Sequence, residues 1–94
     1  MANRGAEFSE TTRRIERRRW RLKNPDKLNQ PLQIHHIVNV WAGEKYGVPR
    51  QAMKSQMNAV AVTPEFHQQI HRDQDEETQF ELAQYLISVY RTLL

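Results

Sequence analysis

The stretches LQIHHI (residues 32–37) and NAVAVTPEFHQQIH (residues 58–71) decide the fold that we expect for this chain. The apolar and polar pattern of residues 33–38 predicts one short strand, and the β-branched valines of residues 58–62 predict a second. All four histidines of the chain lie in these two stretches. The prediction of the fold and the prediction of a site therefore concern the same residues.

A helix is predicted to begin directly after the second strand. Thr63 suits the N-cap, Pro64 the first helical position, and Glu65 adds an acidic group to the first turn. This start places His67 and His71 four residues apart on one helical face, with Cβ atoms about 5–6 Å from each other. Two imidazoles at that separation can bind one ion. Such a pair also occurs on helices that bind nothing, so the other histidines decide its meaning. We expect Phe66 and Ile70, on the adjoining stripe, to anchor the helix to the strands.

Residues 39–57 form a long connection between the two strands. A structureless loop of this length is unusual in a small domain, so we expect helical turns within it. One turn is predicted at Trp41–Tyr46, stopped by Gly47, and another at residues 49–56. The two aromatic residues of the first turn are expected to pack in the core rather than to stack on nucleic-acid bases.

The ordered set His35-His36, Asn58, and the pair His67 and His71 resembles the HNH endonuclease family, and the resemblance spans residues 32–72. Members of that family fold as a β-hairpin packed on one helix around a metal ion. The resemblance implies an α+β, mainly helical protein with a ββα-metal core. It also implies hydrolysis of phosphodiester bonds in DNA.

The resemblance assigns a role to each of these residues. It implies that His35, His67 and His71 bind one divalent metal ion and that His36 is the general base for the attacking water. Adjacent side chains in a strand point to opposite faces, so the two neighbouring histidines are expected to do different jobs. Asn58 is grouped with the catalytic residues, and its amide can hydrogen-bond the backbone across the hairpin or orient the base. Three imidazoles suit Zn²⁺ or Ni²⁺ better than Mg²⁺, with Mn²⁺ a further candidate.

The chain departs from the family pattern in two ways. It contains no cysteine, so it has neither disulfides nor the CxxC pairs that bind a structural zinc in many HNH proteins. The stretch between His36 and Asn58 is also longer than the corresponding stretch of the compact family hairpin. Stability is therefore expected to come from packing.

Basic residues concentrate near the N-terminus. Residues 1–27 hold nine Lys or Arg against four Asp or Glu, a net charge of +5, whereas residues 28–94 hold five against seven, a net charge of −2. We expect a helix at residues 13–23, with Ser9 as its N-cap and an end at Asn24 before Pro25. Within it, Ile15 and Leu22 are expected to face the protein.

The arginines of this helix are predicted to face solvent and bind phosphate, because Arg forms charge-assisted bonds to phosphate oxygens. The alternative is a solvated basic face without a partner. The predicted DNA-binding residues are Arg13, Arg14, Arg17, Arg18, Arg19 and Arg21. If they do not bind DNA, the remaining candidates are Lys45, Arg50, Lys54 and Arg72.

Residues 73–94 are predicted to form an amphipathic helix, capped by Asp73 or Asp75. Its expected core stripe comprises Phe80, Ala83, Leu86 or Ile87, Tyr90 and Leu93. Further apolar residues widen this surface, namely Leu82, Tyr85, Val89 and Leu94. Part of the helix is therefore a candidate surface for a protein partner or a second copy of the chain.

The chain is short enough for one domain, with a basic helix and linker at residues 1–31, the hairpin unit at 32–72 and the last helix at 73–94. It shows neither a membrane-spanning stretch nor a secretory signal, so a cytoplasmic location without membrane attachment is the default expectation. The leading hypothesis is a metal-dependent HNH endonuclease. The alternatives are a nucleic-acid-binding module that does not cut and a zinc-stabilised structural domain. Retention of His36 favours the enzyme, since a structural site has no use for an additional unliganded imidazole.

Overall fold

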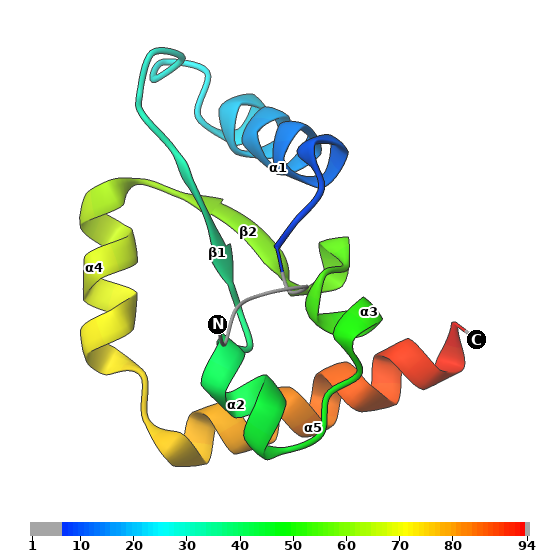
Figure 1. Cartoon of the computed structure of the whole chain (residues 1–94). Helices are drawn as coiled ribbons and strands as arrows, with labels where there is room; N and C mark the ends of the chain where they lie inside the picture. Colours follow the sequence, from blue (N-terminus) through cyan, green and yellow to red (C-terminus); the bar gives the residue numbers. More distant parts are fainter. Residues whose placement is uncertain (1–6, 94) are drawn as a thin grey trace.

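A computed structural model describes residues 7–93, apart from the side chain of Asp73. It shows a mainly helical α+β fold, which confirms the predicted class (Figure 1). The elements in chain order are α1 (Glu10–Lys23), β1 (Gln33–His36), α2 (Val40–Lys45), α3 (Arg50–Met53), the 3-10 turn η1 (Gln56–Asn58), β2 (Ala59–Val62), α4 (Pro64–Asp73) and α5 (Glu76–Thr92). None of the helices in this described range is long and apolar enough to cross a membrane.

The two strands form one antiparallel pair at the centre of the molecule. His35 lies opposite Val60 and His36 lies opposite Ala59. Both strands are shorter than predicted, because β1 ends at His36 and β2 begins after Asn58. In Figure 1 the pair separates α4 from α1, and α4 contacts β1 whereas α1 contacts β2. The two faces of the strand pair are therefore covered by different helices.

The connection between the strands contains the two helical turns that the sequence predicts. The first, α2, is capped by Asn39, whose side chain accepts a hydrogen bond from the Ala42 N–H at 2.9 Å. It stops before Gly47, which has φ +72° and so adopts the left-handed conformation that favours glycine. The second is split into α3 and η1. This compact path explains how a long connection fits a small domain.

The hydrophobic core lies between α2, α3 and α5 rather than inside the hairpin unit. Its buried members are Val38, Ala42, Val48, Ala52, Met53, Ala83 and Leu86. Tyr46 packs against this core as predicted, and its ring meets that of Phe80 edge-on at a centroid distance of 5.0 Å. Trp41 is 45% exposed, so the prediction that it is a packing residue is wrong.

Helix α5 begins at its predicted cap, because the Thr78 N–H donates to the Asp75 carboxylate at 2.7 Å. Ala83 and Leu86 are buried, and Ile87 and Tyr90 pack against the core. Phe80 and Leu93 are exposed, so including them in the core was wrong. Of the residues predicted to widen the apolar surface, Leu82 packs on the core, Tyr85 is exposed, Val89 is half-buried, and Leu94 lies outside the described residues.

Helix α1 has the predicted ends but faces the protein with a different stripe. Ser9 caps it by accepting a hydrogen bond from the Thr12 N–H at 3.1 Å. The prediction that Ile15 and Leu22 point inward is wrong, since these side chains are 38% and 71% exposed. The helix instead contacts β2, with Glu16 as its buried residue.

Hydrogen bonds allow Glu16 to be buried on this face of α1. The Glu16 carboxylate accepts hydrogen bonds from Arg19 at 3.2 Å and from Gln56 at 3.0 Å, which offsets the cost of its burial. Half-buried Trp20 lies beside it, next to the small alanines of β2. The heptad spacing of Ile15 and Leu22 therefore did not identify the face of α1 that contacts β2.

Helix α4 starts as predicted, with the Thr63 hydroxyl accepting a hydrogen bond from the Phe66 N–H at 3.3 Å. Phe66 itself is 53% exposed, so it does not anchor the helix to the hairpin as expected. Ile70 is half-buried. The helix is held to β1 by few apolar contacts, so polar groups between the two elements matter more.

Candidate metal centre

Three histidines from two elements converge between β1 and α4. His35 comes from β1, and His67 and His71 come from one face of α4. Each offers one ring nitrogen, and these three atoms all lie within 4.8 Å of one another. The His35 ring meets the His67 and His71 rings edge-on at centroid distances of 4.9 and 5.4 Å. The set predicted as metal ligands is therefore close enough to bind one ion.

Gln33 orients one ligand of this cluster. Its side-chain oxygen lies 2.6 Å from His67 Nδ1, so that nitrogen donates and His67 Nε2 carries the free lone pair. This is the arrangement by which outer hydrogen bonds orient metal-binding imidazoles. His67 Nε2 then lies 2.9 Å from His71 Nε2. Zn–N bonds of about 2.0–2.1 Å in a tetrahedral site separate two ligand nitrogens by roughly 3.3 Å, so a small opening accommodates the ion.

The environment keeps the cluster in the protonation state that binds metal. His35 is 4% exposed, and burial, followed by the nearby imidazoles of His67 and His71, lowers its pKa from 6.5 to about 4. Burial, and then the charge of His71, also lowers the pKa of His67. Since neutral imidazoles coordinate metal and protonated ones do not, both residues are ready ligands at neutral pH.

The donor set fits a transition metal ion. Imidazole nitrogen is a preferred ligand of Zn²⁺ and Ni²⁺, whereas Mg²⁺ prefers oxygen. Within the described residues the cluster comprises three histidines and no carboxylate. Three protein ligands are typical of catalytic zinc sites, which keep a position open, while structural sites usually have four.

His36 lies on the other face of β1. Its ring stacks on that of Phe8, with centroids 4.1 Å apart and planes at 20°. A pocket of about 460 Å³ on this face is lined by His36 and Phe8 together with Arg13 and Arg17. The structure therefore separates the predicted base from the three predicted ligands, as strand alternation requires.

Asn58 braces the end of the hairpin. It is 1% exposed, and its Oδ1 accepts a hydrogen bond from the Val38 N–H at 2.7 Å. Its Nδ2 donates to the backbone carbonyls of Val38 and Met53, both at 3.1 Å. Of the two jobs open to this amide, the structure shows the first, which is bonding the backbone across the hairpin.

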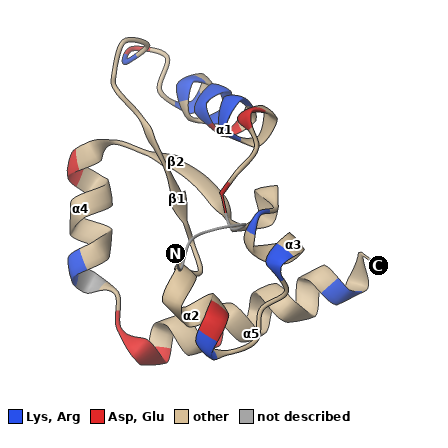
Figure 2. Cartoon of the chain, viewed as in Figure 1, with Lys and Arg blue, Asp and Glu red and all other residues tan. Residues whose placement is uncertain are grey.

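The six arginines predicted to bind phosphate lie on different sides of α1. Figure 2 shows how strongly basic residues gather on this helix. Arg19 forms an ion pair with buried Glu16 at 3.2 Å, and Arg17 pairs with Glu10 at 2.9 Å. A hollow on the outer side of the helix is lined by Arg14, Arg17, Arg18 and Arg21. The solvent-facing prediction holds for Arg13, Arg14, Arg18 and Arg19, which are exposed, whereas Arg17 and Arg21 are half-buried.

Sequence reasoning missed Gln33 and Phe8. Gln33 was detectable, because it precedes His35 by two residues and so shares its face of the strand. Phe8 lies far from His36 in the sequence and gave no local signal. Its burial, at 6% exposed, depends on how the chain before α1 passes the sheet.

Comparison of the chain with protein-family models, with curated proteins and with solved structures found no match. Function therefore has to be inferred from the site itself, since a fold alone does not imply a function.

Proposed function

We propose that this chain is a metal-dependent endonuclease of the HNH type that hydrolyses phosphodiester bonds in DNA. The convergence of His35, His67 and His71 within 4.8 Å carries the proposal. Two further observations support it. Within the described residues the cluster has three ligands, whereas a structural zinc site usually has four, and His36 follows His35 in the chain as the candidate general base.

The residues of the chain have separate roles in this reaction. A divalent ion bound by the three histidines would neutralise charge on the phosphate and stabilise the departing 3′ oxygen. His36 takes the proton of the attacking water. In-line displacement needs attack and departure on opposite sides of phosphorus, so the bound phosphate must reach both the ion and His36. Asn58 is a positioning residue, since it holds the end of β1 next to both histidines.

The arginines next to His36 support a further phosphate of the DNA on that face of β1. Arg13 and Arg17 line the same pocket as His36, and a guanidinium can donate two parallel hydrogen bonds to phosphate oxygens. The Arg17 ion pair with Glu10 is exposed, so exchanging the carboxylate for phosphate costs little.

A non-cutting nucleic-acid-binding module is the second candidate. The stacking of His36 on Phe8 favours it, because this ring faces away from the histidine cluster. Such a module binds DNA and metal but leaves the strand intact. A cleavage assay separates the two candidates.

Metal binding is expected to raise the melting temperature of the chelator-treated protein. Ligand at about 100 times its Kd adds about 2.7 kcal/mol to the free energy of unfolding, which corresponds to a rise of about 10 °C or more in a domain of this size. The rise should shrink as the pH falls, because protonated imidazoles cannot bind the ion. Differential scanning fluorimetry with Zn²⁺, Ni²⁺, Mn²⁺ and Mg²⁺ measures it, and plasmid cleavage is followed with the same ions. An unchanged melting temperature and an intact plasmid with all four ions would overturn the proposal.

Neutralising the outer arginines of α1 is expected to weaken DNA binding at every sequence. Each lost phosphate contact should lower the log–log dependence of affinity on salt by about 0.9, so Arg14→Gln with Arg18→Gln should lower it by about 2. Both side chains are exposed, so the protein should stay folded. Anisotropy titrations of a labelled duplex at several salt concentrations measure the slope. The control Arg91→Gln removes an exposed charge from α5, and an equal effect per charge there would contradict specific DNA binding by α1.

A further inference from the structure

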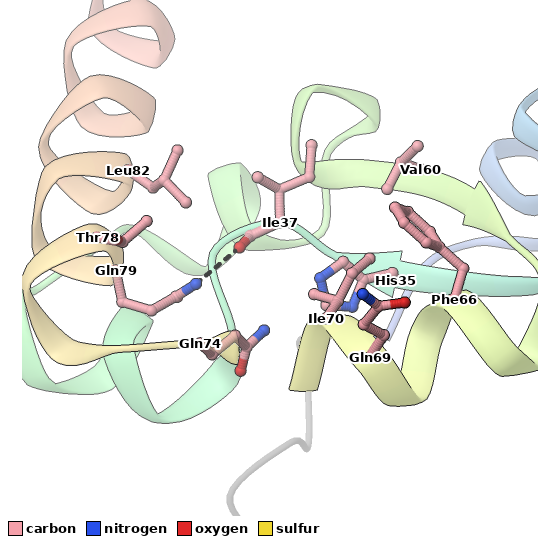
Figure 3. Close-up of a pocket in the computed structure, with 10 residues that line it drawn as sticks. All are labelled: His35, Ile37, Val60, Phe66, Gln69, Ile70, Gln74, Thr78, Gln79 and Leu82. Atoms are coloured by element: carbon pink, nitrogen blue, oxygen red, sulfur yellow. Dashed lines mark hydrogen bonds between the residues drawn. The ribbon is translucent and has the colours of Figure 1, made fainter. Parts of the chain in front are cut away.

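A largely apolar pocket lies next to the histidine cluster, and the roles assigned above leave it unused (Figure 3). It has a volume of about 390 Å³ and opens between the hairpin, α4 and α5. Its apolar wall comprises Ile37, Val60, Phe66, Ile70 and Leu82, and His35 is part of the same wall. One imidazole of the candidate metal centre therefore also borders this pocket.

An exposed aromatic ring lies at the pocket. Phe66 is 53% exposed although it comes from the helix that carries His67 and His71. Figure 3 shows its ring beside Val60, on the opposite side of the pocket from Leu82. An apolar face of this kind can stack on a planar group, and every nucleobase offers such a face.

An unpaired hydrogen-bond donor lies in the same pocket. Asn39 Oδ1 caps α2, so its Nδ2 points away and donates to Gln74 Oε1 at 2.9 Å. This hydrogen bond fixes the orientation of the Gln74 amide, with Oε1 toward Asn39 and Nε2 pointing away from Asn39. This nitrogen is buried and has no hydrogen-bond partner among the described residues.

The neighbouring amide in the pocket contrasts with Gln74. Gln79 donates to the Ile37 carbonyl at 3.2 Å and accepts a hydrogen bond from the Asn39 N–H at 2.9 Å, so both of its ends are used. In Figure 3 the Gln74 nitrogen points toward the interior of the pocket. Because a buried unpaired donor is unfavourable, an acceptor seated in the pocket would relieve the cost.

We propose that this pocket receives one unpaired nucleobase of the DNA strand whose phosphate lies at the histidine cluster. The proposal rests on the proposed function, because that phosphate places the base. The volume is at the small end of the range of about 300–1,000 Å³ for ligand pockets, as suits one nucleoside. Phe66 stacks on the base and Gln74 Nε2 donates to a base carbonyl. The substrate is therefore a DNA strand that is single-stranded or locally unpaired at the cut.

The carbonyl requirement gives the pocket a base preference. Thymine, cytosine and guanine carry a carbonyl oxygen, and adenine does not. Adenine accepts hydrogen bonds only through its ring nitrogens, which lie closer to the ring than an exocyclic oxygen, so a donor positioned for a carbonyl should lose about 5-fold or more in affinity with adenine. A thymine strand should therefore bind more tightly than an adenine strand.

The test compares labelled oligothymidylate with labelled oligodeoxyadenylate by fluorescence anisotropy in metal-free buffer, where the strands stay intact. Phe66→Ala should weaken oligothymidylate binding about 5- to 150-fold through loss of stacking. Gln74→Leu keeps the side-chain size and should reduce the thymine preference about 5-fold. Adenine strands stack on themselves, and comparing the ratio between variants removes this effect.

Matched controls come from residues outside the pocket. Gln68→Leu makes the same change on an exposed position of α4, and Phe80→Ala removes an exposed phenylalanine of α5. Neither control should alter the affinity for oligothymidylate or the ratio of its affinity to that of oligodeoxyadenylate. The proposal is overturned if wild type binds neither strand, or if Phe66→Ala and Gln74→Leu match their controls. Loss of metal-dependent cleavage with these binding effects intact would contradict the endonuclease and leave base binding standing.

Discussion

His36→Ala is expected to slow metal-dependent DNA cleavage about 10²–10⁴-fold while leaving metal affinity unchanged. The reason is geometric. The three ligand atoms lie within 4.8 Å of one another and come from His35, His67 and His71, whereas His36 stacks on Phe8 across the strand. Single-turnover cleavage of a plasmid measures the rate, and calorimetric titration measures the metal affinity.

His67→Ala is the matched variant, since it removes an imidazole from the cluster itself. It should lose both tight metal binding and cleavage, because the two remaining histidines, His35 and His71, cannot replace the missing ligand. Equal loss of metal affinity in His36→Ala and His67→Ala would contradict the separation of base and ligand. Full cleavage by His36→Ala would show that another group takes the proton.

Asn58→Ala is expected to destabilise the protein by about 3–5 kcal/mol, because it leaves three buried backbone groups without partners. These groups are the N–H and carbonyl of Val38 and the carbonyl of Met53. A small domain has a free energy of unfolding of about 5–15 kcal/mol, so most of the margin would be lost. Urea unfolding followed by circular dichroism measures the change.

Asn29→Ala is the control for Asn58→Ala, because Asn29 is an exposed asparagine in the loop before β1. It should change the free energy of unfolding by less than about 0.5 kcal/mol. A cost below about 1 kcal/mol for Asn58→Ala would contradict its role as the brace of the hairpin. Metal affinity should fall with stability, because the brace adjoins the strand that carries His35.

Local signals predicted the helix starts well. Ser9, Asn39, Thr63 and Asp75 each cap a helix through a side-chain oxygen, a bond that needs only residues three positions apart. Ser9, Thr63 and Asp75 are predicted as caps from the sequence, and Asn39 is not. Gly47 likewise stops α2 where the sequence indicated. These features depend on neighbours in the chain, so a single sequence suffices to find them.

Faces of helices were predicted less well. Phe66 and Leu22 are apolar and yet exposed, while Glu16 is acidic and yet buried. Whether a side chain is buried depends on the segment that its helix packs against. The partners of Glu16 include Gln56, which is forty positions away in the sequence. Spacing along α1 contains no information about that partner.

The sequence by itself determined the element types, the caps and the pairing of His67 with His71, because these follow from backbone geometry over a few residues. The resemblance to the HNH family implied that His35 would join that pair. Only the tertiary structure decided that His35 turns toward α4, that His36 meets Phe8, and that the Gln74 amide keeps an unpaired donor. Each of these results depends on contacts between segments distant in the sequence, and packing of the whole chain selects them.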